Sequence, residues 1–406
     1  MYGLVLEGGG ARGAFQIGSW KALREIGVEI KGISGTSVGA LNGAMIIQDD
    51  FEKTYDLWYN LSPSQVVNVE DEMAEKLMKL DIKYDEINYL VKGLSKLWND
   101  MGIDITPLKE LLKVNIDEEK IRKSDMDFGI TTICLTDMKP LELFIEDIEE
   151  GKLINYLLAS SRMLVFKQER LDGKLFIDGG YYNKLPINLL SSKGYKDLIV
   201  VKLDKYEPIF KAVEDNLNIT YIKPSEELGR MLDFSQSKIR RNMELGYFDT
   251  IKTFHKLKGR KYYVRPKGNE SYFLDYFMNL DEDTVLRMGK ILGTPDMPFK
   301  RMLFEYIIPR LAELLGLQKD VNYEEIVLAI FEEAAQRYDI ERFKVYSFED
   351  LEDEVLEKFR PCKESVSNKI PRFLKQSDLV LKTFKDDILN EIIDELLGSI
   401  AWVTSV

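Results

Sequence analysis

The sequence predicts an α/β fold in which helices cover a mostly parallel central sheet. Three observations support this. Short apolar runs alternate with amphipathic segments through residues 1–47, glycine-rich turns separate them, and further apolar runs follow a long helical stretch. Tight alternation of this kind is typical of parallel strands joined by helical crossovers. The expected strands are residues 2–6, 28–33, 128–135, 141–145, 175–177, 198–203 and 219–222.

The first four elements are predicted from the spacing of apolar residues and from the glycines that end each element. Residues 2–6 are a short apolar run that stops at Glu7 and a glycine cluster, as a buried strand does. Residues 11–26 place apolar side chains at helical spacing, and Gly27 is a typical helix end. The strand at 28–33 and a small-residue helix at 40–47 complete the pattern.

Two regions depart from this alternation. Residues 50–122 show helical periodicity without a convincing strand, including a leucine-rich pattern from Leu77 to Leu97, and predict a helical insertion or lid. Beyond residue 268 amphipathic helices dominate, and the last one is expected to begin at Ser377 and end at Gly398. We therefore expect a catalytic domain over 1–267 and a mainly α-helical region of unknown role over 268–406.

Composition excludes several classes of protein. The net charge of −13 and the pI near 5.0 argue against nucleic-acid binding, which needs a basic face. Only Cys134 and Cys362 are present, so a disulfide scaffold is excluded and a reducing compartment is favoured. With no signal-peptide pattern and no apolar run long enough to span a bilayer, we expect a cytoplasmic protein. The sequence does not indicate an oligomeric state.

A glycine-rich loop joins the first strand to the first helix. Its glycines, Gly8, Gly9, Gly10 and Gly13, allow backbone N–H groups to approach a ligand closely, and the following helix adds its positive end. Such a loop suits a phosphate or an oxyanion that forms during a reaction. Arg12, within the loop, is expected to fix it in place or to neutralise nearby charge.

The second strand and the second helix are joined by Gly35-Thr36-Ser37-Val38-Gly39. This is the G-x-S-x-G pattern of a nucleophile elbow, in which Gly35 and Gly39 tolerate a sharp turn that presents the serine. The two loops should lie side by side at the carboxyl ends of adjacent parallel strands. There Ser37 would attack a carbonyl, and the N–H groups of Gly9, Gly10 or Val38 would hold the developing O⁻.

A serine nucleophile needs a base, and histidine is almost absent. The single histidine, His255, lies in the last polar turn of an expected helix, where a cap or surface role is more common than catalysis. Among the carboxylates Asp178 is the best candidate, because it ends a short strand and Gly179 and Gly180 keep its approach open. Protonation of Asp178, and not of an imidazole, would then set the acid limb of the pH–rate profile.

Together, G-G-G-x-R-G, G-x-S-x-G and the downstream D-G-G resemble the patatin-like phospholipases, of the bacterial type. Weaker similarity includes residues 159–161, 222–225 and 246–249, so the resemblance covers about residues 1–260. It implies a patatin-like three-layer fold and a lipid acyl hydrolase with Ser37 as nucleophile and Asp178 as its base. No metal or organic cofactor is implied, and metal-ligand spacing of His and Cys is absent.

The chain departs from the family pattern at two places. Arg162-Met163-Leu164 stand where the family usually has a small residue and then a proline, and Lys184 replaces an asparagine before Pro186. Both changes are expected in loops near the two catalytic residues, so they bear on the shape and charge of the acyl pocket.

Three other functions are compatible with parts of the pattern. An acyltransferase would use the same residues with another acceptor, and a non-catalytic lipid-binding scaffold could retain the fold. Gly8, Gly10 and Gly13 also satisfy G-x-G-x-x-G, with Glu29 as a possible ribose-binding acid of a dinucleotide site. Against the dinucleotide site, Glu29 falls near the start of the second strand, whereas a ribose-binding acid belongs at its carboxyl end.

A lipid substrate raises the question of membrane contact. A net charge of −13 is repelled by anionic bilayers. The stretch from 252 to 267 is locally basic, however, with the cations Lys252, Lys256, Lys258, Arg260, Lys261, Arg265 and Lys267. We expect either this stretch or the helical insertion to touch a membrane surface transiently.

Overall fold

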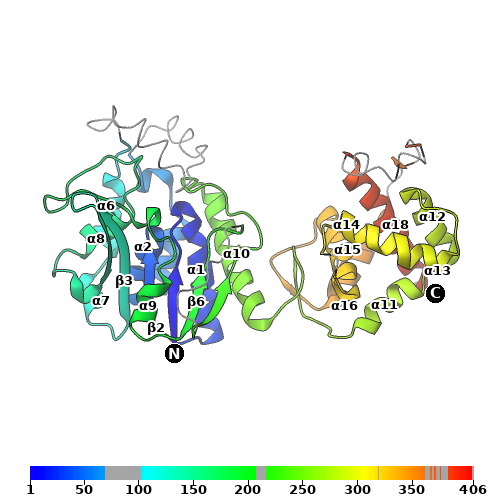
Figure 1. The fold of residues 1–406 in the computed structure, drawn as a ribbon, viewed down its shortest axis with the longest axis horizontal. Coiled ribbons are helices and arrows are strands. Elements are labelled where there is room, and N and C mark those ends of the chain that lie inside the picture. The colour runs from blue at the N-terminus through cyan, green and yellow to red at the C-terminus, as the bar shows by residue number, and fades with distance from the viewer. Residues whose placement is uncertain are drawn as a thin grey trace. The chain divides into compact units, whose positions relative to one another are not determined.

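The chain folds into two compact units, residues Met1–Phe254 and His255–Val406. Figure 1 shows a computed structural model. It describes residues 1–68, 102–206, 216–318, 320–361, 366–367, 370–371, 375 and 383–404. The sequence-based boundary at 267 lies inside the second unit as the contacts define it, because Tyr262 and Val264 pack into the core of the C-terminal helices.

The strands described in the first unit form a seven-stranded sheet in the order β4-β3-β2-β1-β6-β7, with β5 paired to β3 beside β2. β1, β2, β3, β6 and β7 pair in parallel, whereas β4 and β5 run antiparallel to β3. The sheet is therefore mixed but mostly parallel, as expected. Its strands are β1 (Tyr2–Leu6), β2 (Ile30–Thr36), β3 (Asp127–Cys134), β4 (Lys139–Phe144), β5 (Phe176–Asp178), β6 (Asp197–Val201) and β7 (Asn218–Ile222).

Helices cover both faces of this sheet, which gives three layers (Figure 1). One face is covered by α1 (Ala14–Ile26), α2 (Val38–Ile47) and α8 (Leu153–Ser160); on it, Gly43 of α2 lies against Ile33 and Phe128. The other face packs on α9 (Ile187–Ser192) through an apolar cluster that includes Val5 and Val200. The long helix α10 (Gln236–His255) crosses α1 closely: Gly18 of α1 lies against the Met243 carbonyl, and Gly246 of α10 lies against the Phe15 carbonyl.

The expected strand and helix positions hold, with differences at their ends. The first helix begins with a 3₁₀ turn, η1 (Gly10–Gly13), before α1. β2 continues past 33 to Thr36, because Gly35 is paired on both sides, with Leu6 of β1 and Ile130 of β3. Ladder pairing on two edges outweighs the weak strand preference of glycine.

The pairing of β3 brings two distant loops together. β4 occupies one edge of β3 over residues 129–134, so β2 and β5 must share the other edge. Thr36, the last residue of β2, is opposite Thr131, and Asp178, the last residue of β5, is opposite Thr132. The carboxyl ends of β2 and β5 therefore meet head to head on β3, and the residues that follow them converge.

The described part of the insertion is helical. It contains α3 (Phe51–Tyr59), the 3₁₀ turn η2 (Pro63–Gln65), α6 (Thr106–Asn115) and α7 (Glu118–Arg122). The leucine-rich pattern from Leu77 to Leu97 lies outside the described residues.

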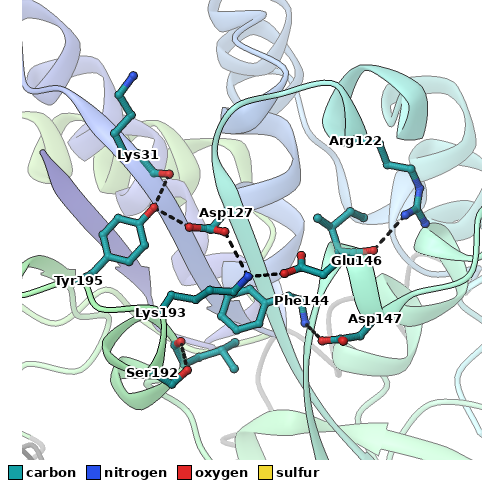
Figure 2. Close-up of polar contacts among 11 residues, drawn as sticks. Lys31, Arg122, Asp127, Phe144, Glu146, Asp147, Ser192, Lys193 and Tyr195 are labelled. Atoms are coloured by element: carbon teal, nitrogen blue, oxygen red, sulfur yellow. Dashed lines mark hydrogen bonds and ion pairs between the residues drawn. The ribbon is translucent and has the colours of Figure 1, made fainter.

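The opposite end of the sheet, at the amino ends of β2 and β3, is held by a polar cluster (Figure 2). Lys193 pairs with Asp127 and Glu146, and its ammonium lies 4.4 Å from the centre of the Phe144 ring. The Tyr195 hydroxyl donates to Asp127 Oδ2 at 2.8 Å, and burial raises its pKa together with that carboxylate. These contacts join α9 to β3 and β4, so the cluster has a structural role.

The second unit is a helical domain with its own core of large apolar side chains. One difference from the sequence prediction is a short parallel pair, β8 (Tyr263–Val264) with β9 (Val345–Tyr346), so strands do not end before residue 268. Its helices are α11 (Glu270–Met278), α12 (Glu282–Leu292), α13 (Phe299–Met302), the π-helical η6 (Leu303–Ile307), α14 (Ile308–Leu314), α15 (Tyr323–Arg337), α16 (Phe348–Lys358) and α18 (Lys385–Thr404).

The predicted end of the last helix at Gly398 is wrong. α18 runs through Gly398 to Thr404, because nothing forces that glycine into the left-handed conformation that ends a helix. The expected cap, Ser377, lies outside the described residues.

Candidate active site

Ser37 lies at the sharp turn between β2 and α2. Its backbone has φ 55° and ψ −127°, a strained conformation that a non-glycine residue adopts when the surrounding structure imposes it. The turn is tight enough that a Cβ on Gly39 would lie 2.2 Å from the carbonyl oxygen of Leu6, and one on Gly35 would lie 2.3 Å from Gly39. The local geometry is therefore that of a nucleophile elbow.

The structure brings Ser37 and Asp178 into direct contact. The Ser37 hydroxyl donates to Asp178 Oδ2 at 2.6 Å, and the two side chains are 4% and 0% exposed. The other carboxylate oxygen accepts the N–H of Gly180 at 2.7 Å, in the turn η5 (Gly179–Tyr181) that follows β5. A short hydrogen bond in a dry environment orients the hydroxyl for loss of its proton.

The glycine-rich loop lies beside this pair and is tied down on both sides. The N–H of Gly8 donates to the carbonyl of Lys184 at 3.0 Å, so this amide supports the loop. Gly10 has φ 58°, and a Cβ there would lie 2.2 Å from the Met231 carbonyl oxygen, so only glycine fits. Arg12 Nε donates to the carbonyl of Gly229 at 2.7 Å, which anchors the loop from outside.

The backbone N–H groups of Gly9, Gly10 and Val38 are the candidate oxyanion donors. Among the described residues no acceptor is hydrogen-bonded to the backbone N–H of Gly9, Gly10 or Val38, which stand at the starts of η1 and α2. Gly13 lies directly against the Val38 side chain, so the two helix starts approach each other closely. The arrangement suits the charge that develops on a carbonyl oxygen attacked by Ser37.

Ser160 is a site residue whose role the sequence analysis did not assign. Its hydroxyl accepts the backbone N–H of Ser37 at 2.9 Å and donates to the carbonyl of Thr131 at 2.7 Å. It is fully buried at the end of α8 and so fixes the elbow to β3. The Ala159-Ser160-Ser161 similarity was the only indication in the sequence.

An apolar cavity of about 70 Å³ opens from Ser37. Helices α2, α3 and α6 and the segment after α8 form its walls, and nearly all lining side chains are aliphatic or aromatic. The lining residues are Gly10, Ser37, Val38, Leu41, Asn42, Met45, Leu57, Trp58, Leu61, Val66, Leu108, Leu111, Leu112, Ser161, Met163, Phe166, Leu232 and Phe234.

Asn42 connects the cavity wall to the glycine-rich loop. Its amide donates to the carbonyl of Gly13 at 3.0 Å and to Gln16 at 2.8 Å, and it accepts the indole N–H of Trp58 at 2.9 Å. Gln16 in turn donates to the carbonyl of Glu7 at 2.7 Å. These buried groups satisfy one another, so the network holds α3 against the loop.

Both departures from the family pattern lie beside the Ser37–Asp178 pair. The carbonyl of Arg162 accepts the N–H of Asp178 at 2.8 Å, and the carbonyl of Lys184 accepts the N–H of Gly8 at 3.0 Å. These are backbone contacts, which do not depend on the side chain. The Arg162 guanidinium is buried, which lowers its pKa, and it donates to the carbonyl of Glu169 at 2.9 Å. Met163 forms part of the cavity wall.

Tyr181 reports on the environment of the pair. Burial raises the pKa of Tyr181 to about 12, with a smaller contribution from the negative charge of Asp178. Its hydroxyl oxygen accepts the N–H of Leu164 at 3.4 Å. The phenol therefore stays neutral well above physiological pH.

The remaining sequence candidates lie elsewhere. His255 is exposed at the end of α10, and Glu29 precedes β2 and pairs with Lys31 at 2.9 Å. Of the basic stretch, Lys261 pairs with Glu333 and Lys267 with Glu349. In the described parts of the chain, no three His, Cys, Asp or Glu side chains gather as they would around a metal ion, and no helix has the length and apolar content to cross a membrane.

Comparisons with known proteins point to one family. Residues 4–191 match the family model described as "Patatin-like phospholipase". The patatin-like phospholipase domain-containing protein ZK370.4 of Caenorhabditis elegans is 26% identical over 68% of this chain, which spans 19% of that protein. Lysophospholipase NTE1 of Kluyveromyces lactis is also 26% identical over 68% of the chain, which spans 18% of it.

Among solved structures, VipD from Legionella pneumophila aligns with 100% of this chain and 92% of its own, at 14% identity and a TM-score of 0.40. The type III effector protein ExoU aligns with 96% and 76%, at 13% identity and a TM-score of 0.36.

Proposed function

Because residues 4–191 belong to the patatin-like phospholipase family, we propose that this protein is a serine lipid acyl hydrolase of the phospholipase A or lysophospholipase type. The observation that supports the proposal is the 2.6 Å hydrogen bond from Ser37 to a buried Asp178 at the mouth of an apolar cavity. A polar pair at the end of an apolar cavity suits an ester whose acyl group is long and whose carbonyl must reach the serine.

The proposed reaction uses the pair as nucleophile and base. Ser37 Oγ attacks the ester carbonyl while Asp178 takes the hydroxyl proton, and the N–H groups of Gly9, Gly10 and Val38 stabilise the oxyanion. Asp178 returns the proton to the leaving alcohol, which leaves an acyl-enzyme. Water, activated by the same carboxylate, then releases the fatty acid and restores Ser37. A carboxylate is a weak base for a hydroxyl, so the oxyanion donors must supply much of the acceleration.

Acyl transfer is the alternative with the same first half-reaction. A bound alcohol would take the place of water, and the product would be a new ester. Product analysis with and without added lysophospholipid or glycerol separates the two. A non-catalytic scaffold predicts no turnover at all, and a dinucleotide site has no ribose-binding acid at the carboxyl end of β2, because Glu29 precedes that strand.

The proposal includes a transient contact with a membrane surface, and we keep the cytoplasm as the expected compartment. Lys256 and Arg265 are exposed cations of the basic stretch and serve to test it, whereas Lys261 and Lys267 already pair with carboxylates. Sedimentation with anionic liposomes tests this contact. Reversal of the charges of Lys256 and Arg265 should weaken binding to the liposomes. Unchanged binding would mean that these two residues do not form the membrane contact.

The decisive test of the catalytic proposal is the Ser37→Ala variant. It should abolish hydrolysis of phospholipid and lysophospholipid and also covalent labelling by a fluorophosphonate, while its circular dichroism stays that of the wild type. Ser19→Ala is a suitable control, because Ser19 is equally buried in the same unit and bonds only to helix carbonyls among the contacts described. A Ser37→Ala variant that kept most of its activity would refute the assignment.

A further inference from the structure

A second cavity begins where the apolar cavity ends. It has a volume of about 280 Å³ and polar walls that include Asp50, Lys53, Asp117 and Lys120. Met45 and Leu57 line both cavities, so these two side chains stand between them. A chain that enters from Ser37 meets this pair before it meets any charge.

Helices α2, α3 and α6 each contribute residues to both cavities, and the division between the cavities can be followed along each helix. On α2, Val38 and Leu41 line the apolar cavity, Met45 lines both, and Gln48 lines the polar one. These positions follow one another at intervals of three and four residues, so they form one stripe along the helix. The order on α2 therefore gives the cavity a direction, away from Ser37 toward the polar side.

The lining residues of α3 and α6 also change from apolar to polar near Met45 and Leu57. On α3, Trp58 faces the apolar cavity, Leu57 faces both, and Lys53 faces the polar one. On α6, Leu112 lines the apolar cavity and Asn115 the polar one. Agreement among three helices makes the boundary a property of the fold, not of one side chain.

The far side of the boundary is fixed by hydrogen bonds. Gln48 donates to the carbonyl of Asn115 at 3.2 Å and accepts the N–H of Asp117 at 2.6 Å. These bonds join the end of α2 to the connection between α6 and α7. The hydrogen bonds therefore fix the position of the polar groups that a chain would meet beyond Met45 and Leu57.

From these observations we propose that Met45 and Leu57 form the floor of the acyl site and limit the substrate to medium-chain acyl esters. This inference rests on the proposed hydrolase function. From Ser37 to Met45 the helix rises by about 12 Å, the extended length of an acyl chain of roughly eight to ten carbons. A longer chain would have to push past the floor and place methylenes among charged groups, which is unfavourable.

The test compares p-nitrophenyl esters from four to sixteen carbons on the wild type, Met45→Ala and Leu57→Ala. The wild-type kcat/KM should rise to about ten carbons, by up to roughly fourfold per methylene, and fall beyond that. Each variant should raise kcat/KM for the sixteen-carbon ester, relative to the eight-carbon ester, at least tenfold. Leu57 is only half-buried, so its variant is the safer of the two for folding.

The matched control is Ile47→Ala. It removes the same number of heavy atoms from a buried side chain on the same helix, but Ile47 lines neither cavity. Its chain-length profile should equal that of the wild type. A profile that shifts equally in Ile47→Ala would mean that any loosening of α2 admits longer chains, which would overturn the floor.

A binding arm separates the inference from the proposed function. Calorimetric titration of the Ser37→Ala variant with fatty acids of eight to sixteen carbons needs no catalysis. Affinity should fall beyond about ten carbons, and adding Met45→Ala should remove that fall. If binding follows this pattern but the wild type cleaves no ester, the limit on chain length is supported and the proposed hydrolase function is refuted. If neither ester cleavage by the wild type nor fatty-acid binding depends on chain length, the hydrolase function is supported and the limit set by Met45 and Leu57 is refuted.

Discussion

Each unit of this protein contains a buried carboxylate, and the two are satisfied in different ways. Asp178 in the first unit accepts the backbone N–H of Gly180 and the hydroxyl of Ser37. Glu332 in the second unit is 2% exposed and accepts the backbone N–H groups of Arg260, Lys261 and Tyr262. The chemical group is the same, but the donors differ.

The difference matters because only one kind of donor can give up its proton. A backbone amide nitrogen is not a nucleophile and keeps its proton, so the carboxylate of Glu332 can hold a turn but has no proton to accept from it. Asp178 accepts a hydroxyl proton that leaves when Ser37 attacks a carbonyl. Burial of a carboxylate therefore does not by itself indicate catalysis; the identity of the donor does.

Among variants of the two carboxylates and their surroundings, Asp178→Asn should have the largest effect. The amide keeps the shape of the carboxylate but cannot take the proton, so the hydrolysis rate should fall by about two to four orders of magnitude. Esterase assays at saturating substrate measure the change. Asp249→Asn is the control: Asp249 is a buried carboxylate of the same unit that accepts the N–H of Ser225 at 2.7 Å, and its variant should keep the wild-type rate. Equal losses in both variants would contradict a special role for Asp178.

Glu332→Gln should act on stability and leave catalysis unchanged. The amide oxygen can still accept the three N–H groups, but without the negative charge, and the new NH₂ group would face the N–H of Arg260, so we expect about 2–3 kcal/mol of destabilisation in the second unit. Calorimetry and hydrogen exchange at Arg260, Lys261 and Tyr262 measure it. Glu333→Gln, which removes only a partly exposed partner of Lys261, should cost less than about 1 kcal/mol. A large loss of esterase activity in Glu332→Gln at a temperature where it remains folded would argue against the distinction drawn here.

Ser160→Ala changes the position of the nucleophile and leaves both carboxylates intact. The Ser37 N–H loses its acceptor, so kcat should fall about tenfold at nearly constant KM, corresponding to ~1.4 kcal/mol. Steady-state kinetics on the full chain provide the readout. Ser19→Ala again serves as control, since it loses a similar buried hydroxyl away from the site. Equal kcat in the two variants would show that Ser160 only supports the fold.

His255→Ala should have the smallest effect. The imidazole is exposed at the end of α10, so the rate should change by no more than a few-fold and the pH–rate profile should superimpose on that of the wild type. The measurement is kcat/KM from pH 4 to pH 9. A missing acid limb in this variant would mean that histidine is the base and that the Ser37–Asp178 pair has been misinterpreted.

The sequence by itself determined the strand–helix alternation and the positions of both glycine loops. Backbone demands are local: a strand followed by a tight turn and a helix start leaves few alternatives to glycine, so the pattern is visible without tertiary information. The weak motifs around Ser225 and Asp249 also proved informative, since these residues bond to each other in the structure. The end of α18 was missed because a glycine ends a helix only when the chain turns there.

Only the tertiary structure decided which groups face one another. Ser37 and Asp178 meet because β2 and β5 share one edge of β3, a pairing that no local pattern encodes. Ser160 accepts the Ser37 N–H because the fold places the end of α8 beside the turn at Ser37. The two cavities divide at Met45 and Leu57 because the side chains that α2, α3 and α6 present there change from apolar to polar. Contacts between residues far apart in sequence depend on strand order and helix packing, and these are set by the fold as a whole.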